Sequence, residues 1–278
     1  MPCLELTRLN RPFQTVLTYL PCATGIVHAA VDSHSQTLSL SQVLLCLLAW
    51  LPVSILQSSY AHKVDDIIDQ DIDRQVIRSR NQPLPRGAIS PIQASVFAAL
   101  QAISLIALSA WTLPRALPIY PAAAIFACIV YSFGKRFTNY PQPILGSRSL
   151  KLSAGSIRGV LFLWVVMVDV LYAFQGLTDD LTAWVKSMSV RFQHATRRLF
   201  AVLGASYMLL PWISGVAAGL GRYFYAAAGC AAVSLLVNLG WVDVKTSASC
   251  RWRFAKGFSL TAGIVFFGLL GVACQREP

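Results

Sequence analysis

Long apolar stretches separated by short polar connections dominate the pattern of this 278-residue chain. A membrane-spanning helix needs about 20 predominantly apolar residues, and it tolerates Pro and Gly better than a soluble helix does. The pattern therefore predicts an all-α fold, a multi-spanning transmembrane helical bundle that forms a single domain over residues 1–278. The eight predicted spans are residues 14–31, 39–61, 91–112, 117–134, 159–174, 199–220, 223–241 and 257–274.

Composition points in the same direction. The chain is 55% hydrophobic and 13% charged, whereas a soluble domain carries about 25% charged residues. Its net charge of +11 is spread over short connections, so we expect the lipid bilayer as partner and not nucleic acid. No obligate protein partner is inferred. The opening residues MPCLELTRLNRP lack an Arg/Ser-rich leader, which favours an ER-like endomembrane over the mitochondrial inner membrane.

The basic residues of the connections follow the positive-inside rule with one exception. High and low counts of Lys and Arg should alternate, yet segments 135–158 and 175–198 are both basic, with five and four. One crossing is missing there. Either residues 141–158 make a poor, re-entrant pass, or about one helix is absent near 146–158. We favour the second, because GSRSLKLSAGSIRG is too polar to span a membrane by itself.

Five of the twelve acidic residues fall within nine positions, Asp65, Asp66, Asp69, Asp71 and Asp73. Carboxylates at 65/66, 69 and 73 recur every four residues and are predicted to lie on one helix face, where they repel. A divalent cation removes that repulsion, and Mg²⁺ prefers a few carboxylates together with substrate phosphate oxygens. Arg78, Arg80 and Arg86 follow directly, as a diphosphate site requires. A solvated acidic loop is the alternative.

These residues carry a resemblance to a known family. The segment DDIIDQDIDRQVIRSRNQPLPRGAIS (65–90) resembles the first signature of the UbiA superfamily of intramembrane prenyltransferases, with Gln82 in place of the usual Arg. Three further segments are similar to family sequences in the same order, and the last resembles the fungal 4-hydroxybenzoate polyprenyltransferase-like branch. They are YSFGKRFTNYPQPILG (131–146), DVLYAFQGLTDDLTAWVKS (169–187) and VDVKTSASCRWRFAKGF (242–258).

The second acidic signature departs from the family pattern. Gly176 stands where its first Asp is expected and Trp184 where a Gly is usual, while Asp180 is retained and Asp179 is a substitute. In the family, nine helices place both signatures on one membrane face, over a central cavity. With eight spans, three crossings would separate them, so we expect the two clusters on opposite faces and unable to share a diphosphate.

The resemblance implies Mg²⁺-dependent transfer of a farnesyl-like prenyl group from a prenyl diphosphate to an aromatic or polyketide-derived acceptor, in meroterpenoid or secondary-metabolite biosynthesis. The metal ligands it implies are Asp65, Asp69, Asp73, Asp179 and Asp180. The catalytic residues it implies are Asp66, Asp73 and Asp180. The diphosphate-binding residues it implies are Arg11, Arg78, Lys135 and Lys186. The four histidines share no spacing and are interpreted as incidental.

Several alternatives stay open. Within enzymes they are a 4-hydroxybenzoate polyprenyltransferase of ubiquinone synthesis and a UbiA-type terpene cyclase. Gly176 and the missing crossing also favour an inactive relative. A CDP-alcohol phosphotransferase is disfavoured because its DGxxAR signature is absent after Asp66. A transporter is disfavoured because the acids lie at the ends of spans and not at mid-membrane.

Overall fold

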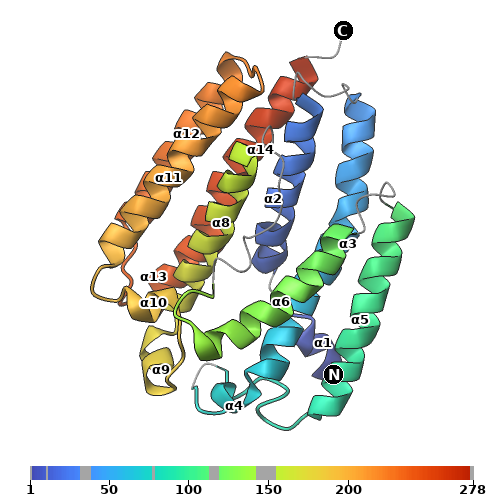
Figure 1. Ribbon diagram of the computed structural model, residues 1–278, viewed down its shortest axis with the longest axis vertical. Helices are drawn as coiled ribbons and strands as arrows, with labels where there is room; N and C mark the ends of the chain where they lie inside the picture. Colours follow the sequence, from blue (N-terminus) through green and yellow to red (C-terminus); the bar gives the residue numbers. More distant parts are fainter. Residues whose placement is uncertain are drawn as a thin grey trace.

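The computed structural model describes residues 2–10, 12–31, 39–76, 79–112, 119–141 and 155–275. Within these ranges, eight long helices lie side by side and form one bundle (Figure 1). Each overlaps one predicted span, so the predicted all-α bundle is confirmed. The long helices are α2 (Pro12–Val31), α3 (Leu40–Ile68), α5 (Pro91–Thr112), α6 (Ile119–Phe137), α8 (Gly155–Phe174), α11 (Thr196–Ala217), α12 (Arg222–Gly240) and α14 (Phe258–Gln275).

Short helices gather toward one end of the bundle, the lower end in Figure 1, together with the N-terminus. They are α1 (Pro2–Leu6), α4 (Gln70–Asp73), α9 (Leu177–Thr182), α10 (Met188–Arg191) and α13 (Ser247–Trp252). A π-helical turn, η2 (Arg253–Gly257), joins α13 to α14. Polar and charged residues between the spans therefore meet at this end.

Among the described residues, five helical stretches are long and apolar enough to cross a membrane by length and composition: α3, α5, α11, α12 and the continuous run 247–275. The apolar part of α8, Gly159–Phe174, is shorter. Large apolar side chains cover the outside of the bundle, for example Leu45, Leu48 and Ile92. An exterior of this kind suits contact with lipid tails.

Helix α2 packs against α3 on one side and α14 on the other, and α3 in turn contacts α5 and α6. Helix α8 packs mainly on α11, and α12 packs on α14 and α11. Buried side chains of α8, α11, α12 and α14 form one apolar core, and α2 joins a second core with α12 and α14. The sides of α2, α3, α6 and α8 that face one another surround a central space.

Helices α6 and α8 run in the same direction. Tyr131, near the end of α6, donates hydrogen bonds to Asp169, near the end of α8. Beyond them, the Lys186 amide donates to the Lys135 carbonyl oxygen at 3.1 Å. The ends of α6 and α8 therefore lie side by side.

The expectation that the two acidic clusters lie on opposite faces is therefore wrong. That expectation took consecutive helices to be antiparallel, whereas α6 and α8 are parallel and Lys135 at the end of α6 lies beside Lys186 beyond α8. We predicted that about one helix is missing near 146–158, and residues 146–154 of that segment lie outside the described residues. That prediction stays a prediction.

Helix α3 begins at a capping box, in which the Ser39 hydroxyl accepts from the Gln42 amide and the Gln42 side chain accepts from the Ser39 amide. It continues seven residues past the predicted end at 61, to Ile68, and so carries Asp65 and Asp66 in its last turns. Asp69 caps it with φ −92° and ψ 9°, and α4 follows. The predicted single helical face is thus interrupted at Asp69.

Candidate active site

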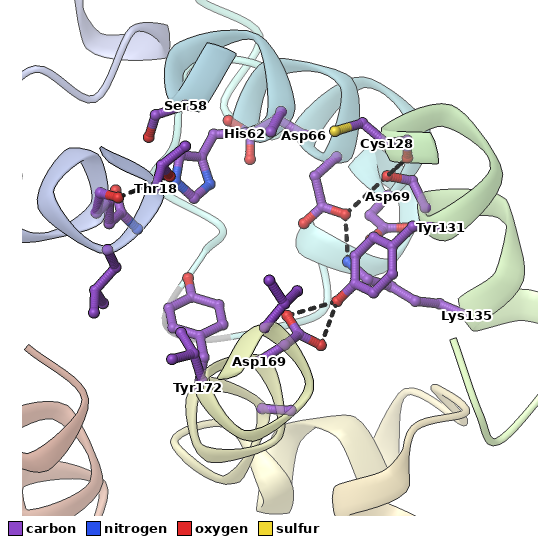
Figure 2. Close-up of a pocket in the computed structure, with 18 of the residues that line it drawn as sticks. Thr18, Ser58, His62, Asp66, Asp69, Cys128, Tyr131, Lys135, Asp169 and Tyr172 are labelled. Atoms are coloured by element: carbon purple, nitrogen blue, oxygen red, sulfur yellow. Dashed lines mark hydrogen bonds and ion pairs between the residues drawn. The ribbon is translucent and has the colours of Figure 1, made fainter. Parts of the chain in front are cut away.

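A cavity of about 400 Å³ opens between α2, α3, α6 and α8 (Figure 2). Carboxylates of both predicted acidic clusters line it. Those of the first cluster are Asp65, Asp66, Asp69 and Asp73, and those of the second region are Asp169 and Asp180. Apolar and aromatic side chains from α2, α6 and α8 line other parts of the wall, together with uncharged polar residues. One space therefore joins charged groups with an apolar compartment.

Lys135 of α6 lies against the first cluster. Its ammonium group donates to Asp65 and to Asp69, the latter at 3.0 Å, and only 15% of its side chain is exposed. Ser132, one turn earlier, donates to Asp65 at 3.1 Å. A buried ammonium between two carboxylates compensates charges that would otherwise be costly to bury. The structure thus places Lys135 beside the acidic residues of the first cluster.

Arg8 was not among the predicted site residues. It forms a buried ion pair with Asp66 and lies 3.4 Å from the Gln82 side-chain oxygen. Its backbone has φ +51°, a left-handed conformation that is uncommon outside glycine and recurs at functional sites. One feature of the sequence could have indicated Arg8 as a site residue: it lies three residues before Arg11 and just ahead of a predicted span.

The segment before α2 is held in place at two points. Leu6 is buried against Leu84 and Ile89. Arg86 and Glu5 form an exposed ion pair at 2.8 Å. Arg86, which we grouped with diphosphate-binding arginines, therefore pairs with α1 and does not line the cavity.

Asp69 and Asp73 face the cavity, whereas Asp71 faces away. Burial raises the pKa of the Asp69 carboxyl to about 7 and also raises that of Asp73, partly opposed at Asp69 by Lys135. Exposed Asp71 forms a two-point ion pair with Arg136, whose hydrogen bonds lower the pKa of Asp71. Within the described chain, one Asp69 oxygen, Oδ1, is buried without a hydrogen-bond partner.

The second acidic region is less complete. Asp169 of α8 accepts from the Tyr131 hydroxyl at 2.9 and 2.8 Å, so it is anchored to α6. Asp180, in the first turn of α9, lines the cavity, but Asp179 beside it does not. Gly176 is the N-cap of α9 and supplies no side chain where the family signature has a carboxylate.

The predicted diphosphate-binding residues have different outcomes. Lys135 lines the cavity. Lys186 is exposed and outside the lining, and its ammonium lies 3.5 Å from the Phe137 carbonyl oxygen. Its predicted role therefore finds no support in this arrangement, because the adjacent residues Val185 and Ser187 turn inward instead. Arg11 and Arg78 lie outside the described residues.

Aromatic side chains form a wall of the cavity that the sequence did not identify. Trp164 and Tyr172 of α8 and Phe254 of η2 line it, and the rings of Tyr172 and Phe254 lie 5.2 Å apart. The π-helical turn widens the helix locally, and such turns are frequent at functional sites. His62 also lines the cavity, so its interpretation as incidental is not supported.

The residues present fit a Mg²⁺ ion that is shared with a substrate diphosphate. Among the described residues, no three His, Cys, Asp or Glu side chains converge closely enough to hold an ion by themselves. Mg²⁺ bound with phosphates uses one or two carboxylates and keeps water in the remaining positions. The unpartnered, buried Asp69 Oδ1 is an available hard oxygen ligand of this kind.

The bundle encloses one cavity that has two acidic regions and a partly aromatic wall. This arrangement is typical of an intramembrane enzyme whose substrate carries a charged group on an apolar chain. The UbiA prenyltransferase family profile matches residues 18–149. A prenyltransferase of Acremonium egyptiacum is 31% identical over 93% of this chain and 80% of its own length. The chain therefore belongs to the UbiA prenyltransferase family and is an integral membrane prenyltransferase.

Other relatives extend this similarity. The DMOA farnesyltransferase of Aspergillus novofumigatus is 35% identical over 81% of this chain and 75% of its own length. The mitochondrial 4-hydroxybenzoate polyprenyltransferase of Arabidopsis thaliana is 27% identical over 96% and 67%. A UbiA homolog from Archaeoglobus fulgidus, bound to GPP and Mg²⁺, has the same fold, with a TM-score of 0.72 at 17% identity over 99% of this chain and 100% of that one.

Proposed function

We propose that this protein transfers a farnesyl-like prenyl group from its diphosphate to an aromatic or polyketide-derived acceptor in meroterpenoid biosynthesis, with Mg²⁺ as cofactor. One observation carries the proposal. The two acidic regions, Lys135 and the aromatic wall line a single cavity. The fungal relatives, one of them named a DMOA farnesyltransferase, favour the farnesyl group and the polyketide-type acceptor.

The acidic end suits the diphosphate. Asp65, Asp69, Asp73 and Asp180 would hold the Mg²⁺. When bound, the metal neutralises charge on the diphosphate and stabilises it as a leaving group. Lys135 and Arg8, paired with carboxylates in the structure described here, lie where their N–H groups can turn to phosphate oxygens.

The aromatic wall suits the prenyl chain. The carbon–oxygen bond of the prenyl diphosphate breaks, and diphosphate leaves with the electron pair. The faces of Trp164, Tyr172 and Phe254 can stabilise the allylic cation by cation–π attraction and keep water away from it. The acceptor ring carbon then forms the new carbon–carbon bond, and a nearby base takes its proton.

The test is an assay of microsomes that contain the full chain, supplied with Mg²⁺, prenyl diphosphates of several lengths, and orsellinic acid or 4-hydroxybenzoate. We expect a farnesylated aromatic product, detected by mass spectrometry and abolished by EDTA. A cyclised hydrocarbon without acceptor would instead identify a terpene cyclase. If neither product forms with any chain length, the enzyme is an inactive relative and the proposal fails.

We further propose an ER-like endomembrane location. The support is the greater similarity to a fungal prenyltransferase of Acremonium egyptiacum, at 31% identity, than to the mitochondrial enzyme of Arabidopsis thaliana, at 27%. A carboxyl-terminal fluorescent fusion in a fungal host should give a reticular pattern. Co-localisation with a mitochondrial dye would favour the ubiquinone alternative.

A further inference from the structure

One wall of the cavity differs from the acidic end because it carries uncharged hydrogen-bonding groups. Gln14 and Thr18 lie one turn apart on α2, and Ser58 and His62 lie one turn apart on α3. In Figure 2, Thr18, Ser58 and His62 gather on one side, opposite Tyr131 and Lys135. Polar groups inside a membrane protein are expensive and mark a ligand site by default.

Gln14 gives the most direct indication of a ligand. Its side chain lines the cavity, the residue is only 8% exposed, and in the described chain its Oε1 atom is buried without a hydrogen-bond partner. A buried amide oxygen that lacks a donor is costly unless a ligand supplies one. A hydrogen-bond donor on a ligand in the cavity would satisfy this oxygen.

Thr18 has a related property. Its hydroxyl proton is donated to the Gln14 backbone carbonyl at 3.0 Å, so the Thr18 oxygen offers the cavity its acceptor lone pairs. Two adjacent acceptors on α2 match a ligand with donor groups. They do not match a diphosphate, which at neutral pH carries mainly acceptor oxygens.

The position of this wall is also suitable for binding the prenyl acceptor. Arg8, just before α2, pairs with Asp66 near the end of α3, so α2 starts at the acidic end and runs antiparallel to α3. Gln14 and His62 consequently lie one turn closer to the acids than Thr18 and Ser58. A ring bound here would lie beside the diphosphate without occupying the carboxylates.

We propose that Gln14, Thr18, Ser58 and His62 form the acceptor subsite and that it takes a hydroxylated aromatic ring, whose phenolic hydroxyl donates to Gln14 Oε1. This assignment rests on the proposed prenyl transfer and adds the position of the acceptor and the chemistry that recognises it. Gln14 and Thr18 supply acceptors for the hydroxyl donor of the ring, and Ser58 and His62 add groups that can donate or accept.

The test is equilibrium binding to the purified full chain in detergent with Mg²⁺ and farnesyl thiodiphosphate, an unreactive analogue. Orsellinic acid, 4-hydroxybenzoate and their phenolic methyl ethers are the probes. Wild-type protein should bind a phenol about tenfold more tightly than its methyl ether, which corresponds to one buried hydrogen bond. Gln14→Leu should remove this preference, and Thr18→Val should reduce phenol binding about threefold.

Gln175→Leu is the matched control, since it also removes a buried amide with an unpartnered atom but one outside the cavity lining. It should keep the preference. Unchanged binding of farnesyl thiodiphosphate shows that each variant is folded. The subsite is overturned if Gln14→Leu keeps the preference or if wild type binds none of the phenols. Phenol binding without any turnover would overturn the proposed function and leave the subsite in place.

Discussion

The two acidic regions of the cavity are built differently. The first, residues 65–73, extends a 29-residue helix and is packed against Lys135 and Arg8. The second depends on α9, a six-residue helix, and Gly176 stands at its N-cap without a carboxylate. The first cluster therefore has ion-pair partners from two other parts of the chain, whereas the second contributes fewer carboxylates to the cavity.

The two acidic regions also differ in backbone conformation. Gly87, in the first signature, has φ +75°, and Gly tolerates this conformation without strain. Trp184, in the second, has φ +56° and is 90% exposed. The resemblance predicts Gly at this position, and Gly would adopt this conformation without strain. The difference teaches that the second region carries backbone strain that the first avoids, while Asp180 still lines the cavity.

The largest effect is expected from the first region. Asp69→Asn should lower kcat/KM for prenyl transfer about 10²- to 10³-fold, because it removes a carboxylate that would hold the Mg²⁺ bound to the substrate diphosphate. Asp71→Asn is the matched control, since Asp71 is exposed and paired with Arg136 outside the cavity. Steady-state kinetics at saturating Mg²⁺ measure both. Equal losses in the two variants would contradict the assignment of Asp69.

Removing the cation of the first region should cost stability as well as activity. Lys135→Gln leaves Asp65 and Asp69 buried without compensation, a change that costs about 3–5 kcal/mol in comparable buried pairs. The thermal unfolding midpoint in detergent should fall clearly. Lys135→Gln combined with Asp65→Asn should recover part of that loss. No recovery would show that Lys135 acts independently of these carboxylates.

The second region should respond more weakly, and differently at its two acids. Asp180→Asn should reduce kcat/KM about tenfold. Asp179→Asn should cost less, because its side chain lies outside the cavity lining. Gly176→Asp should lower the Mg²⁺ concentration needed for half-maximal activity severalfold. If Gly176→Asp needed more Mg²⁺ than the wild type, a carboxylate at position 176 would not contribute to metal binding.

The smallest effect concerns strain. Trp184→Gly should raise the free energy of unfolding by about 1 kcal/mol, since a left-handed conformation costs a non-glycine residue roughly that amount. Thermal unfolding in detergent checks it, with Gly87→Ala as the reverse case, expected to be destabilising. A less stable Trp184→Gly would show that the exposed indole contributes more than the backbone strain removes.

Much of the fold could be predicted because membrane spans are encoded locally. Runs of apolar residues placed all eight long helices, and spacing placed Asp65, Asp66, Asp69 and Asp73 together. The charge pattern also detected that the segment between α6 and α8 is unusual. It could not reveal that α6 and α8 are parallel, since direction depends on the path of the connection and not on either helix.

The sequence by itself determined the helical membrane architecture, the acidic cluster and the family resemblance, because each depends on residues close together in the chain. Only the tertiary structure decided that both acidic regions share one cavity, that Arg8 pairs with Asp66, and that Phe254 and Gln14 line the wall. These relations join residues up to 240 positions apart, from Gln14 to Phe254, and helix packing alone brings them together.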